Sequence, residues 1–189
     1  MEATIYKRKR VFSIGEKSSV LAKLSAALEN SGFSTKWSNK SSNVNALVQD
    51  FHGNHFDLVL FGRGIKPENK KLITQRFRSQ NEQLIFIDAL APLSELMVDQ
   101  VKLAFVQEAG KMPCIVHTDS KALSIEILED CQLQVRSYEQ KWLARTSENL
   151  LLSARLQGGT FSVPLKPSSG KQFLVVSVDD VVIFIKEIV

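Results

Sequence analysis

The chain has 189 residues, of which 44% are hydrophobic and 23% are charged. This composition supports one or two buried cores and excludes a disordered chain. No apolar run reaches the roughly 20 residues of a membrane-spanning helix, and the basic N-terminal segment lacks the apolar stretch of a signal peptide. Two cysteines, Cys114 and Cys131, are too few for a disulfide framework. We therefore expect a cytoplasmic protein with no membrane partner.

Residues 1–111 alternate strand patterns with segments whose apolar residues recur at helical spacing. The run DLVLF at 57–61 is continuously apolar, as central parallel strands require. Four such alternations predict an α/β domain with a three-layer, doubly wound parallel sheet of flavodoxin- or Rossmann-like type. The expected strands are 9–14, 33–37, 57–61 and 84–87, and the helices that follow them begin near Ser18, Ser41, Pro67 and Pro92.

Residues 112–189 show a different pattern, with short strand-like runs separated by turn residues. Gly158-Gly159 is typical of a tight hairpin turn, and Asp179-Asp180 lies in a similar position between two apolar runs. We predict a small all-β domain of five or six antiparallel strands, sandwich or barrel-like. The segment from Cys114 to His117 either completes the parallel sheet or leads into this domain.

Charge is distributed unevenly between these parts. Residues 1–111 hold 16 Lys and Arg against 11 Asp and Glu, whereas residues 112–189 hold 8 against 9. Much of the excess is the run from Lys7 to Arg10. This run has no interleaved aromatic residues and no recognition helix, so it is interpreted as a solvated flank and nucleic acid is not expected as a partner.

Ligands of open α/β sheets bind beyond the carboxyl ends of the strands. Glycines and charged residues follow three of the predicted strands at this edge of the sheet. We expect them to converge on one rim and to form the ligand-binding residues of the domain, which are Gly15, Glu16, Gly62, Arg63, Gly64, Lys66 and Asp88.

The order of elements and the positions of these turns resemble the receiver domain of bacterial response regulators, of flavodoxin-like fold. A receiver has an acidic pair after its first strand, where this chain has Gly15-Glu16. Its phosphoacceptor aspartate falls at Gly62, at the end of DLVLFG. Asp88-Ala89 and Lys111 stand at the positions of its later functional turns. The resemblance implies a degenerate receiver, because Gly62 offers no nucleophile and one carboxylate is a poor magnesium site.

A Rossmann-like nucleotide-binding domain is the rival resemblance. Its G-x-G-x-x-G fingerprint is absent, since the turn after the first strand contains only Gly15. A phosphate-bearing small molecule held by the Gly62-Arg63-Gly64 loop is the form of this hypothesis that stays open, because an arginine between glycines offers a forked donor.

Other candidate residues predict no site. His52 and His55 lie in a loop flanked by Asp50 and Asp57, where nothing specifies the geometry of a metal site. Cys114 and His117 fall on opposite faces of a strand. We therefore assign no catalytic residue, no metal and no cofactor. The final strands, up to Val189, are apolar on both faces, and a sheet edge there predicts pairing between subunits, as in a homodimer.

Three functional hypotheses follow. The first is a non-catalytic regulatory or assembly module, receiver-like but without phosphotransfer, that acts through protein contacts of its β domain. The second is a nucleotide or anion binder that uses the Gly62-Arg63-Gly64 loop. The third is an enzyme with an unrecognised site at the same rim, with Glu16 or Asp88 as the acid or base.

Overall fold

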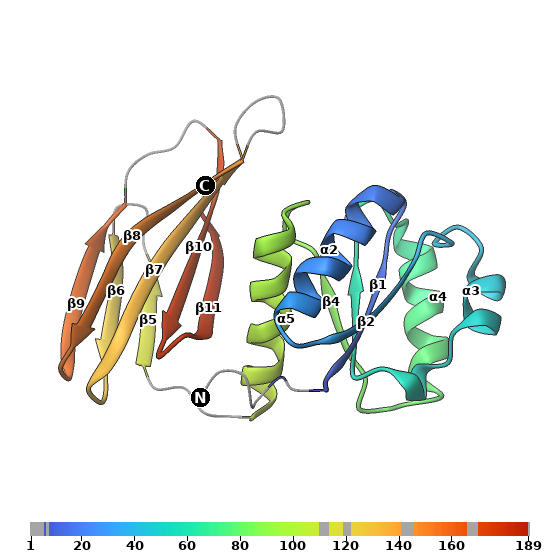
Figure 1. Cartoon of the computed structure of the whole chain (residues 1–189), viewed down its shortest axis with the longest axis horizontal. Coiled ribbons are helices and arrows are strands. Elements are labelled where there is room, and N and C mark those ends of the chain that lie inside the picture. Colours follow the sequence, from blue (N-terminus) through green and yellow to red (C-terminus); the bar gives the residue numbers. More distant parts are fainter. Residues whose placement is uncertain are drawn as a thin grey trace. The chain divides into compact units, whose positions relative to one another are not determined.

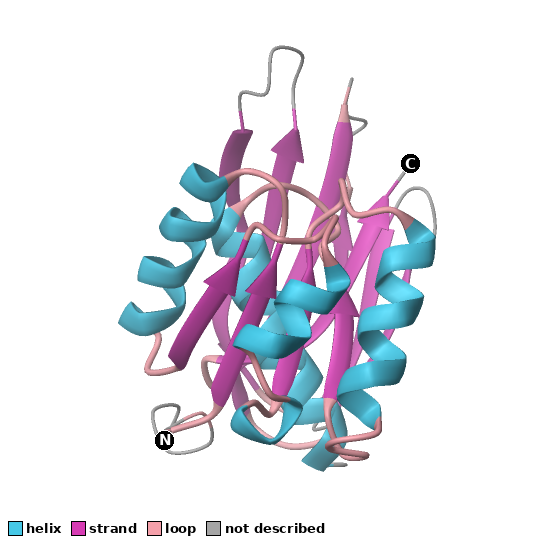
Figure 2. Ribbon diagram, turned by 90° about the vertical axis from the view of Figure 1, so that its right-hand side faces the viewer, coloured by secondary structure: helices cyan, strands magenta, loops and turns pink. Residues whose placement is uncertain are grey.

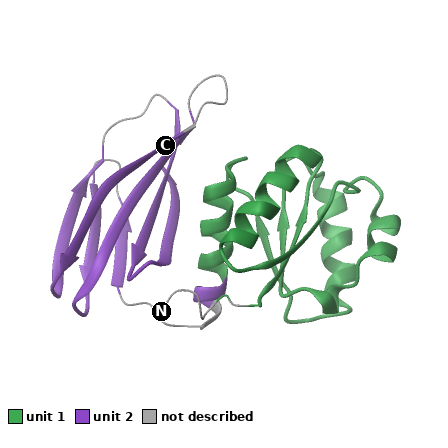
Figure 3. Cartoon of the chain, in the orientation of Figure 1, with its two compact units in different colours: residues 1, 3–104 green, residues 2, 105–189 purple. Residues whose placement is uncertain are grey.

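The computed structural model describes residues 6, 8–109, 114–118, 122–140, 146–165 and 170–188. The chain forms two compact units, one ending at Ala104 and the other beginning at Phe105 (Figure 3). The division falls inside helix α5 (Ser94–Ala109). The sequence placed it at Lys111, which lies outside the described residues.

The first unit contains a parallel sheet flanked by helices, as the sequence predicts (Figures 1 and 2). Its strand order is β2-β1-β3-β4. The strands are β1 (Arg10–Ile14), β2 (Ser34–Ser38), β3 (Leu58–Phe61) and β4 (Ile85–Asp88). Helices α2 (Ser18–Asn30) and α5 cover one face, and α3 (Val44–Asp50) and α4 (Pro67–Arg78) cover the other, with a short 3-10 turn η1 (Gly53–His55) before β3.

Alternation along β1 divides its side chains between the two faces. Phe12 and Ile14 belong to the buried cluster under α3 and α4, where the Phe12 ring stacks on Phe56 with centroids 4.6 Å apart. Ser13, between them in sequence, points to the opposite face, under α2. Each face of the sheet therefore carries its own apolar layer.

Local sequence explains where the helices begin and end. The Asn43 side chain accepts a hydrogen bond from the N–H of Ala46 and so caps α3. Pro67 occupies the first turn of α4, where its missing N–H is not needed. Gly32, with φ of +89°, closes α2 in the left-handed conformation that glycine permits.

An ion pair connects β1 to the residue that precedes β3. Asp57 accepts hydrogen bonds from the Arg10 backbone N–H at 2.7 Å and from its guanidinium at 2.9 Å. Partial burial alone would raise the pKa of the Asp57 carboxyl, but the hydrogen bonds from Arg10 outweigh it, and the pKa lies below its ordinary value. This pair fixes the start of two neighbouring strands.

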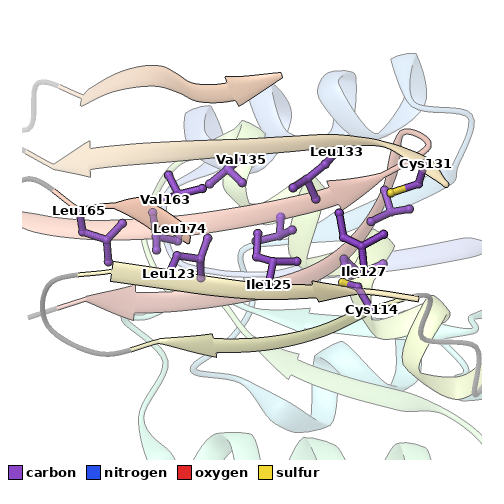
Figure 4. Close-up of a cluster of buried hydrophobic side chains, with 13 residues drawn as sticks. Cys114, Leu123, Ile125, Ile127, Cys131, Leu133, Val135, Val163, Leu165 and Leu174 are labelled. Atoms are coloured by element: carbon purple, nitrogen blue, oxygen red, sulfur yellow. The ribbon is translucent and has the colours of Figure 1, made fainter. Parts of the chain in front are cut away.

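The second unit consists of two antiparallel sheets that share one apolar core (Figure 4). Leu123 and Ile125 of one sheet lie against Leu133 and Val135 of the other in that core. The sheets have the orders β11-β10-β7-β8 and β5-β6-β9. The strands are β5 (Cys114–Thr118), β6 (Ala122–Ile127), β7 (Cys131–Gln140), β8 (Thr146–Leu156), β9 (Gly159–Pro164), β10 (Lys171–Val178) and β11 (Val181–Ile188).

Three features of the second unit differ from the sequence-based picture or complete it. The segment at Cys114 pairs antiparallel with β6, so it belongs to this unit and not to the parallel sheet. The Gly158-Gly159 pair does not form a hairpin, because β8 pairs with β7 whereas β9 pairs with β6 of the other sheet. By contrast, Asp179 and Asp180, with φ of +48° and +65°, do turn β10 into its neighbour β11.

The helices of the described segments are too short or too polar to cross a bilayer.

Candidate functional site

A cavity of about 220 Å³ opens at the carboxyl ends of β1 and β3, entirely within the first unit. Its floor includes Ser13 and Leu60 from the two strands. One wall comes from α2, and another from the segment that leads into α5. The apolar wall residues are Val20, Leu21, Leu24, Ala89, Pro92 and Met97.

Five of the seven residues predicted to bind a ligand line this cavity. They are Gly15, Glu16, Gly62, Arg63 and Gly64. These loops meet at the cavity because the carboxyl ends of neighbouring parallel strands lie at one edge of the sheet.

The other two predicted residues lie elsewhere. Lys66 is the exposed residue that precedes α4. Asp88 is the last residue of β4, and its carboxylate lies 2.5 Å from the Lys70 ammonium of α4. Its side chain therefore faces the α4 side of the sheet, whereas the cavity lies on the α2 side.

Two of the lining glycines allow a close approach. A Cβ at Gly62 would lie 3.3 Å from the carbonyl oxygen of Ile14, so a side chain there would press the ends of β3 and β1 apart. A Cβ at Gly64 would lie 2.7 Å from Oε2 of Glu16. The Glu16 carboxylate, in the loop that follows β1, therefore lies against Gly64 in the loop that follows β3.

The start of α2 supplies hydrogen-bond donors at the mouth of the cavity. Lys17 precedes the helix and provides no side-chain cap, and no acidic residue lies in the first turn. The N–H groups of Ser18 and Ser19 have no acceptor within the described part of the chain. The exposed cations of Lys17 and Arg63 line this mouth together with the single carboxylate of Glu16, so the balance of charge favours a negatively charged group.

Ser13 is the most unusual polar residue of the cavity. The residue is 1% exposed, and its hydroxyl has no hydrogen-bond partner within the segments that the structure describes. Buried hydroxyls are nearly always paired. Ser38, the last residue of β2, shows the ordinary arrangement, since its hydroxyl accepts the N–H of Lys40 at 3.2 Å.

Sequence reasoning missed Ser13 and the apolar walls. The signal for Ser13 is a single hydroxyl inside the apolar strand pattern of RVFSI. The walls follow from how α2 and α5 lie over the sheet, which no local pattern specifies.

The remaining candidate groups form no site among the residues that the structure describes. The rings of His52 and His55 lie 5.8 Å apart, and no cluster of three metal-ligating side chains is present there. Cys114 is buried in the second unit, where desolvation raises the pKa of its thiol to about 11, whereas His117 is exposed. This thiol is protonated at neutral pH and is a poor nucleophile.

No family model matches the chain, and no curated protein sequence matches it. Among solved structures, an NAD kinase from Archaeoglobus fulgidus in complex with ATP is 10% identical, with a TM-score of 0.30 over 95% of this chain and 86% of that one. A TM-score this low carries no information about function.

Proposed function

We propose that the first unit is a non-catalytic binding module that takes a small molecule into the cavity between α2 and α5. The observation that carries the proposal is that Ser13 lines the cavity floor and that its buried hydroxyl has no hydrogen-bond partner among the described residues. Leaving a buried hydroxyl without a partner costs about 1–3 kcal/mol. A ligand that hydrogen-bonds to Ser13 removes this cost, so the hydroxyl favours the occupied state.

The lining defines the chemistry of the ligand. The apolar walls suit an apolar body, such as a ring or a short chain. The free N–H groups at the start of α2 and the guanidinium of Arg63 suit a carboxylate or phosphate at the mouth. The ligand class is therefore a small anion with an apolar body. This is the anion-binding hypothesis of the sequence, with Ser13 and α2 added to the Gly62-Arg63-Gly64 loop.

The strand order supports this location. With the order β2-β1-β3-β4, the chain leaves β1 toward β2 on one side and returns to β3 on the other. Such a switch point is where open α/β sheets bind ligands, and this order agrees with the flavodoxin-like pattern. In the receiver resemblance, Gly62 replaces the phosphoacceptor. A module that binds a ligand, instead of accepting a phosphoryl group, accounts for both the cavity at the switch point and the glycine at the phosphoacceptor position.

The test is a thermal-shift panel on the full chain with octanoate, AMP, NAD, ATP and inorganic phosphate as probes. A probe at a hundred times its dissociation constant should stabilise the chain by about 2.7 kcal/mol. This corresponds to a rise in melting temperature of several degrees.

Variants show whether a shift comes from the cavity. Arg63→Ala and Ser13→Ala should each weaken the stabilising probe. Arg76→Ala removes an exposed cation of α4 outside the cavity and should leave binding unchanged. A panel without any shift, or a shift that Arg63→Ala and Ser13→Ala leave intact, contradicts the proposal.

A role in protein contacts is the second candidate function. The observation that favours it lies in the second unit, where Leu150 is 62% exposed and its neighbour Leu151 is 38% exposed. Consecutive exposed leucines on a strand are typical of a surface that another chain covers. Binding in the first unit and contacts through the second are compatible in a regulatory protein.

A further inference from the structure

The strand β8 forms one edge of the four-stranded sheet of the second unit. It spans Thr146–Leu156, and along this length its inner neighbour is β7. Its outer row of backbone N–H and C=O groups has no strand partner within the described segments. A long edge strand with exposed leucines is a template for pairing with another chain.

A bulge in β8 determines which side chains share a face. Leu152 pairs with Val135 and Leu150 with Arg136, so Leu151 is the extra residue. Because of this extra residue, Glu148 and Arg155 project from the same face although they are seven positions apart. Both side chains are exposed, and they lie opposite Tyr138 and Gln132 of β7. These two positions alternate along β7 with Leu133 and Val135 of the core cluster.

The charges along this edge are self-complementary. An acid stands near one end of β8, a base stands near the other, and leucines lie between them. When two such strands lie antiparallel about a twofold axis, the acid of each copy lies opposite the base of the other. A strand with a single sign of charge would repel its own copy in this arrangement.

We propose that β8 pairs antiparallel with β8 of a second copy of the chain, about a twofold axis that passes between Leu151 and Leu152. Glu148 of each copy then lies opposite Arg155 of the other, Leu150 lies opposite Ser153, and Leu151 lies opposite Leu152 at the centre. The interface is isologous, as in most homodimers. It joins two four-stranded sheets into one. It lies on the β8 edge and not at the C-terminal strand that the sequence suggested.

The test is analytical ultracentrifugation of the full chain over a range of concentrations. The wild-type chain should form dimers. Glu148→Lys places lysine opposite arginine, and Arg155→Glu places glutamate opposite glutamate, so each variant alone should sediment as a monomer. In an equimolar mixture of the two variants, every facing pair is again of opposite charge. The mixture should therefore dimerise.

A matched control reverses an exposed charge on the other sheet. Glu126→Lys of β6 should leave the dimer intact. Glu148 also lies 3.4 Å from Arg136 of its own chain, so the melting temperature of Glu148→Lys is measured to confirm that it folds. The proposal is overturned by a wild-type chain that stays monomeric at every concentration, by reversals that leave dimers intact, or by a mixture that fails to associate.

Discussion

Replacing Ser13 by alanine should stabilise the free protein, although it shortens a fully buried side chain. Ser13 is 1% exposed, and its hydroxyl has no hydrogen-bond partner in the described part of the chain. Removing it recovers the desolvation cost of an unpaired hydroxyl, about 1–3 kcal/mol. It sacrifices little packing, because the Cβ remains and the site already borders a cavity. We expect a net gain of roughly 1 kcal/mol, or about 2–4 °C in melting temperature.

The matched comparison is Ser38→Ala. This serine is 5% exposed at the end of the neighbouring strand, and its hydroxyl accepts a hydrogen bond from Lys40. Its loss should destabilise the protein by about 1 kcal/mol. Urea unfolding is followed by tryptophan fluorescence in a Trp142→Phe background, so that Trp37 of β2 reports on the first unit. If Ser13→Ala destabilises as much as Ser38→Ala does, the Ser13 hydroxyl has a partner and the reasoning is wrong.

Three further outcomes are expected. Asp57→Asn should cost about 1–2 kcal/mol at neutral pH; the lowered pKa of Asp57 means that this difference, read from urea midpoints, shrinks as the pH falls below about 4. Burial of Cys114 should slow its reaction with a thiol reagent at pH 8. The free energy of unfolding should fall by about 1.4 kcal/mol per pH unit between about pH 9 and 11, because in this range the thiol ionises only in the unfolded chain. Cys114→Ala should abolish this part of the slope. Gly53→Ala should destabilise by more than 1 kcal/mol in the same unfolding assay, since its Cβ would lie 2.8 Å from the Phe77 carbonyl oxygen, and an unchanged midpoint would contradict the packing described for η1.

The parallel sheet and its flanking helices were predictable because their signals are local. A continuous apolar run such as DLVLF, followed by a glycine and a helical pattern, specifies a buried strand and a crossover. The loops of the candidate site followed from the same rule, since the carboxyl ends of parallel strands share one edge. Gly62, Arg63 and Gly64 line the cavity for this reason.

The features that sequence reasoning missed depend on direction and on distant partners. Asp88 follows an apolar run as Arg63 does, but it is the last residue of its strand, and its side chain faces Lys70. Gly158-Gly159 looks like a hairpin turn, yet the strand that follows it belongs to the other sheet. A turn signal indicates that the chain reverses, but it does not indicate which strand the next one joins.

The pairing of the second unit has a consequence for how the chain folds. In the first unit, each strand is followed by its helix, and all four strands are complete at Asp88. In the second unit, β7 pairs with β10, although β8 and β9 lie between these two strands in the sequence. The strand β9 pairs with the earlier strand β6. Pairing between distant segments is slow because the intervening loop must close first. During synthesis, the parallel sheet can therefore form before β10 has been made. Until β10 pairs with β7, that edge of β7 stays exposed, and the time for which it is exposed depends on how soon β10 is synthesised.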